Sequence, residues 1–173
     1  MLGDISNFYN VNDYLPIFNG TLLADIIIIL ALYYSPLIKS GILKQWYSRY
    51  RLSAVIADVF IIVIGFIITR AIYTYYKLKW NLLHFILILV SVQIIHDVLF
   101  YLFFSYNPKG SHKMLDFFKE YAKRQQTGAI IGDTIIIIIS ALLASYFKGL
   151  TLNSNIIVII VLIYLIPYLI YKN

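Results

Sequence analysis

The chain has 173 residues, of which 61% are hydrophobic and only 13% are charged, and its formal net charge is +6 at pH 7. Soluble domains are about 45–50% apolar and about 25% charged, so this composition excludes an ordinary soluble domain and indicates an integral membrane protein. The sequence contains no cysteine, which excludes disulfides, thiolate metal sites and a thiol nucleophile.

Five segments are apolar over a length that can cross a membrane. A spanning helix needs about 20 predominantly apolar residues, with a range of about 17–25. In chain order, the predicted spans are residues 17–38, 52–76, 81–105, 127–147 and 154–171. We expect a single membrane domain over residues 1–173, folded as an all-α bundle of these five helices. No cleaved secretory signal peptide is expected, because residues 1–16 are polar and acidic.

The connection at residues 107–126 predicts a short amphipathic helix over about 111–125. Pro108 and Gly110 mark a turn, and aromatic residues then recur at helical spacing. We expect this helix to lie at the membrane surface, where basic side chains are attracted to anionic headgroups. A solvated connector helix is the alternative. The basic residues assigned to the surface are Lys113, Lys119, Lys123 and Arg124.

The distribution of basic residues predicts the orientation of the chain, because cytoplasmic loops are enriched in lysine and arginine. With the N-terminus outside, ten of the 14 lysines and arginines fall on the inner side of the membrane. We therefore expect the N-terminus outside and the C-terminus inside.

Each of the first four predicted spans carries one aspartate in a similar local sequence. The four segments are TLLADIIIIL (21–30), AVIADVFIIV (54–63), QIIHDVLFYL (93–102) and AIIGDTIIII (129–138). On insertion scales an aspartate at a helix centre costs about 2.5–3.5 kcal/mol, so four cost on the order of 10 kcal/mol without relief. Protonation, water, a bound cation or a neighbouring base can supply that relief. Ionisable residues inside a membrane are therefore candidate functional residues.

Helix geometry predicts that three of these aspartates share one layer in the inner half of the membrane. At a rise of 1.5 Å per residue, Asp58 and Asp133 lie about 9 Å from the inner boundary, and Asp97 lies about 12 Å from it. Asp25 is expected higher, nearer to the middle of the membrane.

Further polar side chains accompany Asp97 on the third span. Gln93, Asp97 and Tyr101 are spaced by four residues, so they form one stripe on a helix. His96 is the base best placed to act as a partner, although adjacent side chains point about 100° apart on a helix. The candidate ion pathway consists of Asp25, Asp58, Gln93, His96, Asp97, Tyr101 and Asp133.

Small residues on the same spans predict close contacts between helices, because they allow two backbones to approach each other. The acidic side chains are therefore expected to face other helices rather than lipid. The residues assigned to helix packing are Gly65, Gly128, Gly132, Ser140 and Ala144.

Proton or cation passage is the leading functional hypothesis, because carboxyl groups inside a membrane can relay protons or attract cations. The alternative is a structural or assembly protein of a membrane, in which the same acids only hydrogen-bond helices together. The expected partners are the lipid bilayer, protons or cations, and further copies of the chain, since a small bundle needs them to enclose a pathway. No nucleic acid and no cofactor is expected, and no specific ligand spacing assigns a metal.

An intramembrane aspartyl hydrolase is a minor third hypothesis, in which two facing carboxyl groups share a proton around a water molecule. Asp58 with Asp97 or Asp133 could form such a pair. Gly132-Asp133 is similar to the Gly-Asp of membrane aspartyl proteases, but Ile130 stands where their Gly-x-Gly-Asp motif has its first glycine. The sequence therefore favours a non-enzymatic function.

Four features stand together in roughly residues 90–172: His96-Asp97, the segment 107–110, the predicted helix 114–122 and Gly132-Asp133. With these features, the C-terminal half resembles uncharacterised multi-span membrane proteins of large nucleocytoplasmic DNA viruses. The resemblance implies no particular reaction. It does imply a viral or host membrane as the location of the chain.

Overall fold

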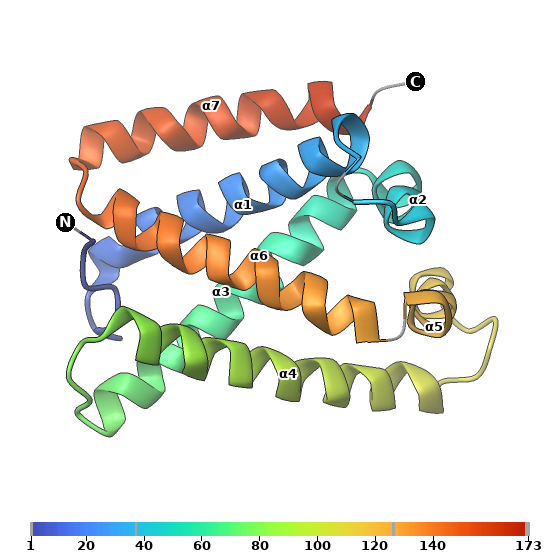
Figure 1. Ribbon diagram of the computed structural model, residues 1–173, viewed down its shortest axis with the longest axis horizontal. Helices are drawn as coiled ribbons and strands as arrows, with labels where there is room; N and C mark the ends of the chain where they lie inside the picture. The colour runs from blue at the N-terminus through green and yellow to red at the C-terminus, as the bar shows by residue number, and fades with distance from the viewer. Residues whose placement is uncertain (1, 37, 126, 172–173) are drawn as a thin grey trace.

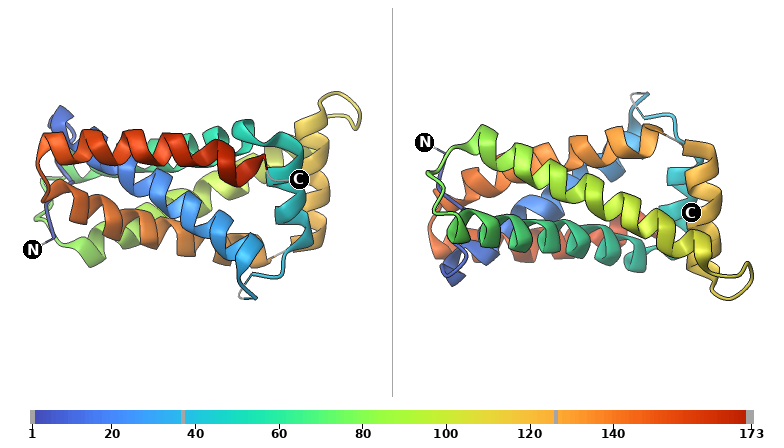
Figure 2. Two further views of the ribbon diagram at one scale, coloured as in Figure 1. Left: turned by 90° about the horizontal axis from the view of Figure 1, so that it is seen from above. Right: turned by 90° about the horizontal axis from the view of Figure 1, so that it is seen from below.

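The computed structural model describes residues 2–36, 38–125 and 127–171, and these residues form helices joined by short connections. The five long helices α1, α3, α4, α6 and α7 run along the molecule, and α2 and α5 lie across one end (Figures 1 and 2). In chain order the helices are η1 (Val11–Asp13), α1 (Tyr14–Tyr34), α2 (Gly41–Tyr50), α3 (Leu52–Tyr75), α4 (Leu82–Tyr106), α5 (Lys113–Gln125), α6 (Thr127–Lys148) and α7 (Leu152–Ile170).

The predicted all-α bundle is confirmed, and its five long helices fit an integral membrane protein. All five are long and apolar enough to cross a membrane. The interfacial helix predicted over about 111–125 corresponds to α5. The two chain termini lie at opposite ends of the bundle, as an odd number of lengthwise helices requires (Figure 1).

The first predicted span, 17–38, is wrong at its C-terminal boundary. Helix α1 ends at Tyr34, and Ser35 is extended with φ −122° and ψ 149°. Proline disfavours helical backbone in the residue that precedes it, and residue 36 is a proline. The apolar composition continues past this point, but the helix does not.

Helix α2 is an element that the sequence interpretation missed, since it expected only one helix outside the five spans. The Ser40 side chain caps α2 by accepting a hydrogen bond from the Leu43 N–H at 3.2 Å. The helix ends at Arg51, whose left-handed backbone (φ 49°) reverses the chain directly into α3. The connection between the first two long helices is therefore itself a folded element at the end of the bundle.

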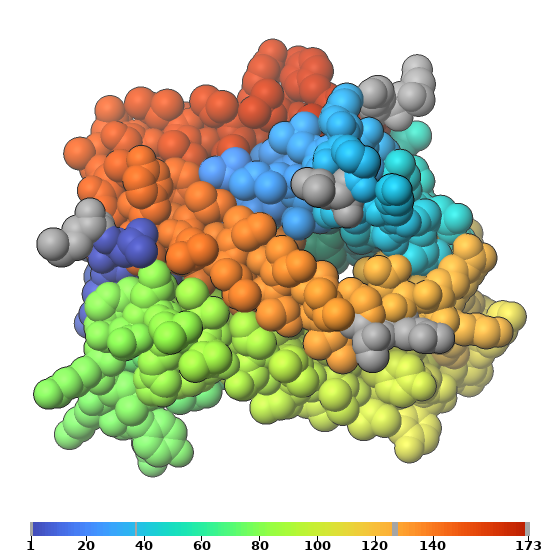
Figure 3. Space-filling model, viewed as in Figure 1, coloured from blue at the N-terminus to red at the C-terminus, as the bar shows by residue number. Residues whose placement is uncertain are grey.

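Helix α1 lies at the centre of the bundle and packs most extensively against α6. It is the most buried of the five long helices, whereas α4 is the least buried. A Cβ atom on Gly20 would lie 2.5 Å from the backbone nitrogen of Ala144, so only glycine allows α1 and α6 to approach this closely. Figure 3 shows α6 beside α4 on one face of the molecule, with part of α1 visible between α6 and α7.

Helix α7 occupies the periphery, as predicted for the fifth span, and packs against α1 and α3. A polar contact fixes it to α1, because the buried Asn19 side chain donates a hydrogen bond to the Asn155 side chain at 2.9 Å. The candidate site is built on the four other long helices, α1, α3, α4 and α6.

Candidate functional site

Asp25 is an aspartate at the centre of the bundle, on the most buried helix. Its side chain is fully buried, and the Tyr47 hydroxyl of α2 donates a hydrogen bond to its Oδ1 atom at 2.7 Å. Its second oxygen, Oδ2, has no hydrogen-bond partner among the described residues. One oxygen of this carboxyl group is therefore satisfied by the protein, and the other is buried without a hydrogen-bond donor.

Asp58 of α3 is held by the neighbouring residue of α2. The Trp46 indole N–H donates a hydrogen bond to Asp58 Oδ2 at 2.9 Å. The same indole stacks on Phe117 of α5, with ring centroids 5.5 Å apart and an interplanar angle of 26°. Trp46 and Tyr47, which are consecutive in α2, thus hold aspartates on α3 and α1. Helix α5, which lies beside α2 at the same end of the bundle, packs against the Trp46 ring.

The environment of Tyr47 shows that it remains a hydrogen-bond donor. Burial raises the pKa of the Tyr47 hydroxyl well above its ordinary value, and the nearby charges of Asp25 and Asp58 raise that pKa further. The phenol therefore keeps its proton throughout the physiological pH range. Asp25 receives the hydrogen bond whenever α2 is in place.

Asp97 of α4 belongs to a cluster of three polar side chains. Gln93 donates a hydrogen bond from Nε2 to Asp97 Oδ1 at 2.6 Å, and His96 Nδ1 lies 3.3 Å from the same oxygen. The side chains of Asp97 and His96 are half-buried, and the His96 ring stacks on Phe100. Asp97 Oδ2 is buried and has no partner among the described residues. Gln93 and His96 therefore do accompany Asp97, as the sequence predicted.

Asp133 of α6 completes the group, and Tyr121 of α5 lies among three of its members. Burial raises the pKa of the Tyr121 hydroxyl, and the charges of Asp133, Asp58 and Asp97 raise that pKa further. These three carboxyl groups therefore lie close enough to one phenol to act on it together. We name Asp25, Asp58, Asp97 and Asp133 the carboxyl layer.

The position predicted for Asp25, above the other three acids, is wrong. Asp25 and Asp58 both act on Tyr47 and interact electrostatically with each other. The physical reason is the early end of α1 at Tyr34, which places Asp25 nearer to the end helices than a helix extending to residue 38 would.

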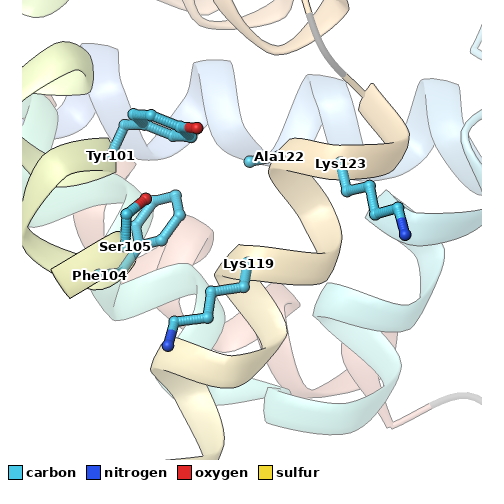
Figure 4. A pocket seen from close by; sticks show the side chains of 6 residues that line it. All are labelled: Tyr101, Phe104, Ser105, Lys119, Ala122 and Lys123. Carbon is cyan, nitrogen blue, oxygen red and sulfur yellow. The ribbon is translucent and has the colours of Figure 1, made fainter. Parts of the chain in front are cut away.

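Tyr101 does not join the carboxyl layer, although it shares a helical stripe with Gln93 and Asp97. Its side chain is 53% exposed and lines a pocket between α4 and α5 (Figure 4). Residues of one helical stripe therefore lie in different environments, because Gln93 faces the interior of the bundle and Tyr101 lies at the surface.

The structure supports three of the five residues assigned to helix packing. Ser140 and Ala144 are fully buried and lie against Gly20 of α1, while a Cβ atom on Gly65 of α3 would lie 3.3 Å from the Leu89 side chain of α4. The other two residues, Gly128 and Gly132, contact no other long helix at their Cα atoms. A Cβ atom on Gly128 would meet only Gln125, and one on Gly132 would meet nothing within 4 Å.

The four basic residues assigned to the membrane surface all belong to α5 and are only partly engaged by the protein. Lys119 donates to the backbone carbonyl of Asn107, and Arg124 pairs with Glu120 at 2.5 Å. The backbone carbonyl of Lys113 accepts a hydrogen bond from the Tyr50 hydroxyl of α2 at 3.0 Å. The Lys123 side chain is exposed.

A second polar cluster closes the opposite end of the bundle, and the sequence interpretation did not identify it. Arg70 is fully buried and lies 3.2 Å from the carboxylate of Asp13, which also pairs with Lys148. Its guanidinium donates to the backbone carbonyls of Asn7 and Asn10 and lies over the Tyr14 ring at 4.5 Å. We name this cluster the Arg70 network.

The sequence analysis did not identify Trp46 and Tyr47, the two donors that hold Asp58 and Asp25. A usable signal was present: Ser40 is a good helix cap, and two adjacent aromatics with polar tips follow within two turns.

The donor set at the carboxyl layer restricts its chemistry. Within the described residues, no group of three or more histidine, aspartate or glutamate side chains is placed to hold a metal ion. Individual carboxyl oxygens without partners can still bind and release a proton. Scans against protein-family models and searches of curated proteins and of solved structures found no match for this chain.

Proposed function

We propose that this chain is an integral membrane protein that moves protons across the membrane through the carboxyl layer. One observation carries the proposal: α1, α3, α4 and α6 each contribute one aspartate to the half of the bundle that α2 and α5 cover, and Tyr47 and Trp46 of α2 hydrogen-bond two of these aspartates. Intramembrane acids are costly and characteristically mark ion pathways and proton relays.

The unpaired oxygens support protons as the moved species. Asp25 Oδ2 and Asp97 Oδ2 are buried without partners. A buried ionised carboxylate without a donor is strongly unfavourable, and a bound proton relieves that cost. A small monovalent cation is the alternative within the same proposal, whereas the donor arrangement gives no support to a chelated divalent metal.

The packing beyond the carboxyl layer favours a carrier that changes conformation over an open pore. Ile17, Phe66, Phe85, Leu89 and Ile137 are almost completely buried between the layer and the far end of the bundle. At that far end the bundle is closed by the Arg70 network, in which the guanidinium is fully buried in an ion pair with Asp13. A proton taken up at the layer therefore needs a rearrangement of the bundle before it is released on the other side.

The proposed orientation places the end helices on the inner side of the membrane. The connections that contain α2 and α5 include nine lysines and arginines, whereas the connections at the other end have few. This asymmetry favours an outside N-terminus. A viral or host membrane is the proposed location, and it rests on the sequence resemblance alone.

A structural role is the second candidate, and two hydrogen bonds favour it. Tyr47 bonds Asp25 and Trp46 bonds Asp58, so these acids also fasten α2 to the bundle. Asparagine distinguishes the two roles, because its side-chain oxygen still accepts a hydrogen bond but the amide cannot relay a proton.

The test is proton flux in proteoliposomes that contain a pH-sensitive dye. Wild type is compared with Asp25→Asn, Asp58→Asn, Asp97→Asn and Asp133→Asn, and the control is Asp116→Asn on α5, outside the layer. Flux that is lost in folded layer variants and kept in the control supports transport. Folded wild type without flux above that of empty liposomes refutes it and leaves the structural role. Replacing sodium and potassium with a bulky cation separates proton movement from cation movement.

A further inference from the structure

A pocket lies between the C-terminal turns of α4 and the second half of α5, away from the carboxyl layer. Its volume is about 270 Å³, just below the range of about 300–1,000 Å³ for pockets that enclose drug-sized ligands. Figure 4 shows the α4 side chains facing the α5 residues across the opening. The lining residues are Tyr101, Phe104, Ser105, Lys119, Ala122 and Lys123.

The polar groups of this pocket are hydrogen-bond donors, and no carboxylate lines it. Within the described part of the chain, the Tyr101 hydroxyl, the Ser105 hydroxyl and the Lys123 ammonium make no hydrogen bond or ion pair. Lys119 gives one N–H to the Asn107 carbonyl, and an ammonium has three donors. Two positive charges and two free hydroxyls, with no carboxylate among the lining residues, make a site for an anion.

The surroundings of the pocket indicate that this anion belongs to an amphiphile. The α4 surface that leads to the pocket exposes large apolar side chains, with Leu99 61%, Leu102 43% and Phe103 56% exposed. Acyl chains can lie along such a surface while a headgroup occupies the pocket. Basic pockets between helices at the cytoplasmic side of membrane proteins are suited to anionic headgroups.

We propose that this pocket binds the phosphate group of an anionic phospholipid. The phosphate receives hydrogen bonds from Ser105 and Tyr101 and pairs with Lys119, while the exposed Lys123 side chain turns toward it. Phe104 forms the apolar floor. The lipid therefore bridges α4 and α5. This site does not depend on transport by the carboxyl layer.

Native mass spectrometry of the full chain in a neutral detergent tests the proposal, because discrete lipid adducts are counted without a charged membrane surface. Phosphatidylglycerol is titrated, with phosphatidylcholine as the zwitterionic comparison. Lys123→Gln should weaken the phosphatidylglycerol adduct about fivefold, which corresponds to about 1 kcal/mol for one basic residue. Lys44→Gln removes the same charge from an exposed position on α2, outside the pocket, and it should leave the adduct unchanged.

Ala122→Phe supplies an independent arm, because it fills the pocket and keeps every charge. The expected result is loss of the phosphatidylglycerol adduct with unchanged thermal unfolding. Equal weakening by Lys44→Gln and Lys123→Gln overturns the proposal, as does equal binding of phosphatidylcholine. Displacement of the lipid by millimolar inorganic phosphate would also overturn it and assign the pocket to a soluble anion.

Discussion

Removal of the Tyr47 hydroxyl tests how strongly the carboxyl layer depends on α2. In Tyr47→Phe the ring and its packing remain, but Asp25 loses its hydrogen bond of 2.7 Å. Asp25 is fully buried and its other oxygen is already without a partner, so neither oxygen is satisfied after the change. Leaving a buried acceptor unsatisfied costs about 1–3 kcal/mol, and more for a charged group. We therefore expect the free energy of unfolding to fall by about 2–3 kcal/mol.

Equilibrium unfolding in mixed micelles, followed by circular dichroism, measures this loss. Tyr50→Phe is the matched control, because Tyr50 lies on the same helix and its hydroxyl bonds an exposed carbonyl at 3.0 Å. Its expected cost is within about 0.5 kcal/mol, as for other surface changes. In an Asp25→Leu background the Asp25 carboxyl group is no longer there to lose its donor, so Tyr47→Phe should cost less than in wild type, and the remaining cost reflects the interaction of Tyr47 with Asp58. An equal cost of the two tyrosine changes, or an undiminished cost in the Leu background, would refute the reasoning.

Three further changes probe other parts of the fold. Gly20→Ala places a Cβ atom 2.5 Å from the Ala144 nitrogen and should cost at least about 1–3 kcal/mol of unfolding free energy in micelles, whereas Gly132→Ala, which faces open space, should cost nothing. Arg70→Met should cost about 3 kcal/mol and accelerate hydrogen exchange of residues 5–10, and unchanged exchange would contradict a role in holding that segment. Tyr121 has a raised pKa when folded, so above about pH 10 the unfolded chain releases a proton that the folded chain keeps. The free energy of unfolding of wild type then falls by up to about 1.4 kcal/mol per pH unit above that pH. If the free energy of unfolding of Tyr121→Phe falls equally steeply between about pH 9 and 11, this reasoning is contradicted.

The long helices could be predicted from the sequence because each depends on a single continuous property, apolar length. Four of the five predicted spans lie within about two residues of the observed helices at both ends, and the exception is the first span, where apolar residues continue beyond Pro36. The preference of the residue before proline, a local backbone effect, ends that helix although hydropathy does not.

The carboxyl layer could be predicted only in part. The depth of a residue follows from the constant rise of a helix, but the contacts between helices do not follow from it. The shared depth of Asp58, Asp97 and Asp133 followed from the helical rise. The partners that complete the site, Tyr47 and Tyr121, come from segments outside the long helices. Their approach depends on how α2 and α5 fold across the end of the bundle.

The Arg70 network was missed for a related reason. Its carboxylate partner lies 57 residues away in sequence, and two of its acceptors are backbone carbonyls, which no side-chain motif encodes. The same holds for Gly20, whose importance depends on the α6 backbone that lies against it. Long-range pairing of this kind requires the three-dimensional arrangement.

Proton flux through Asp133→Asn, compared with Asp116→Asn, tests the central claim most directly. Both changes replace one carboxyl group by an amide, but only Asp133 lies in the carboxyl layer. We predict that wild type and Asp116→Asn dissipate an imposed pH gradient in proteoliposomes. Asp133→Asn should be at least about tenfold slower, equivalent to a barrier raised by about 1.4 kcal/mol. An Asp133→Asn protein that is folded and as fast as wild type would contradict the assignment of the carboxyl layer as the proton pathway.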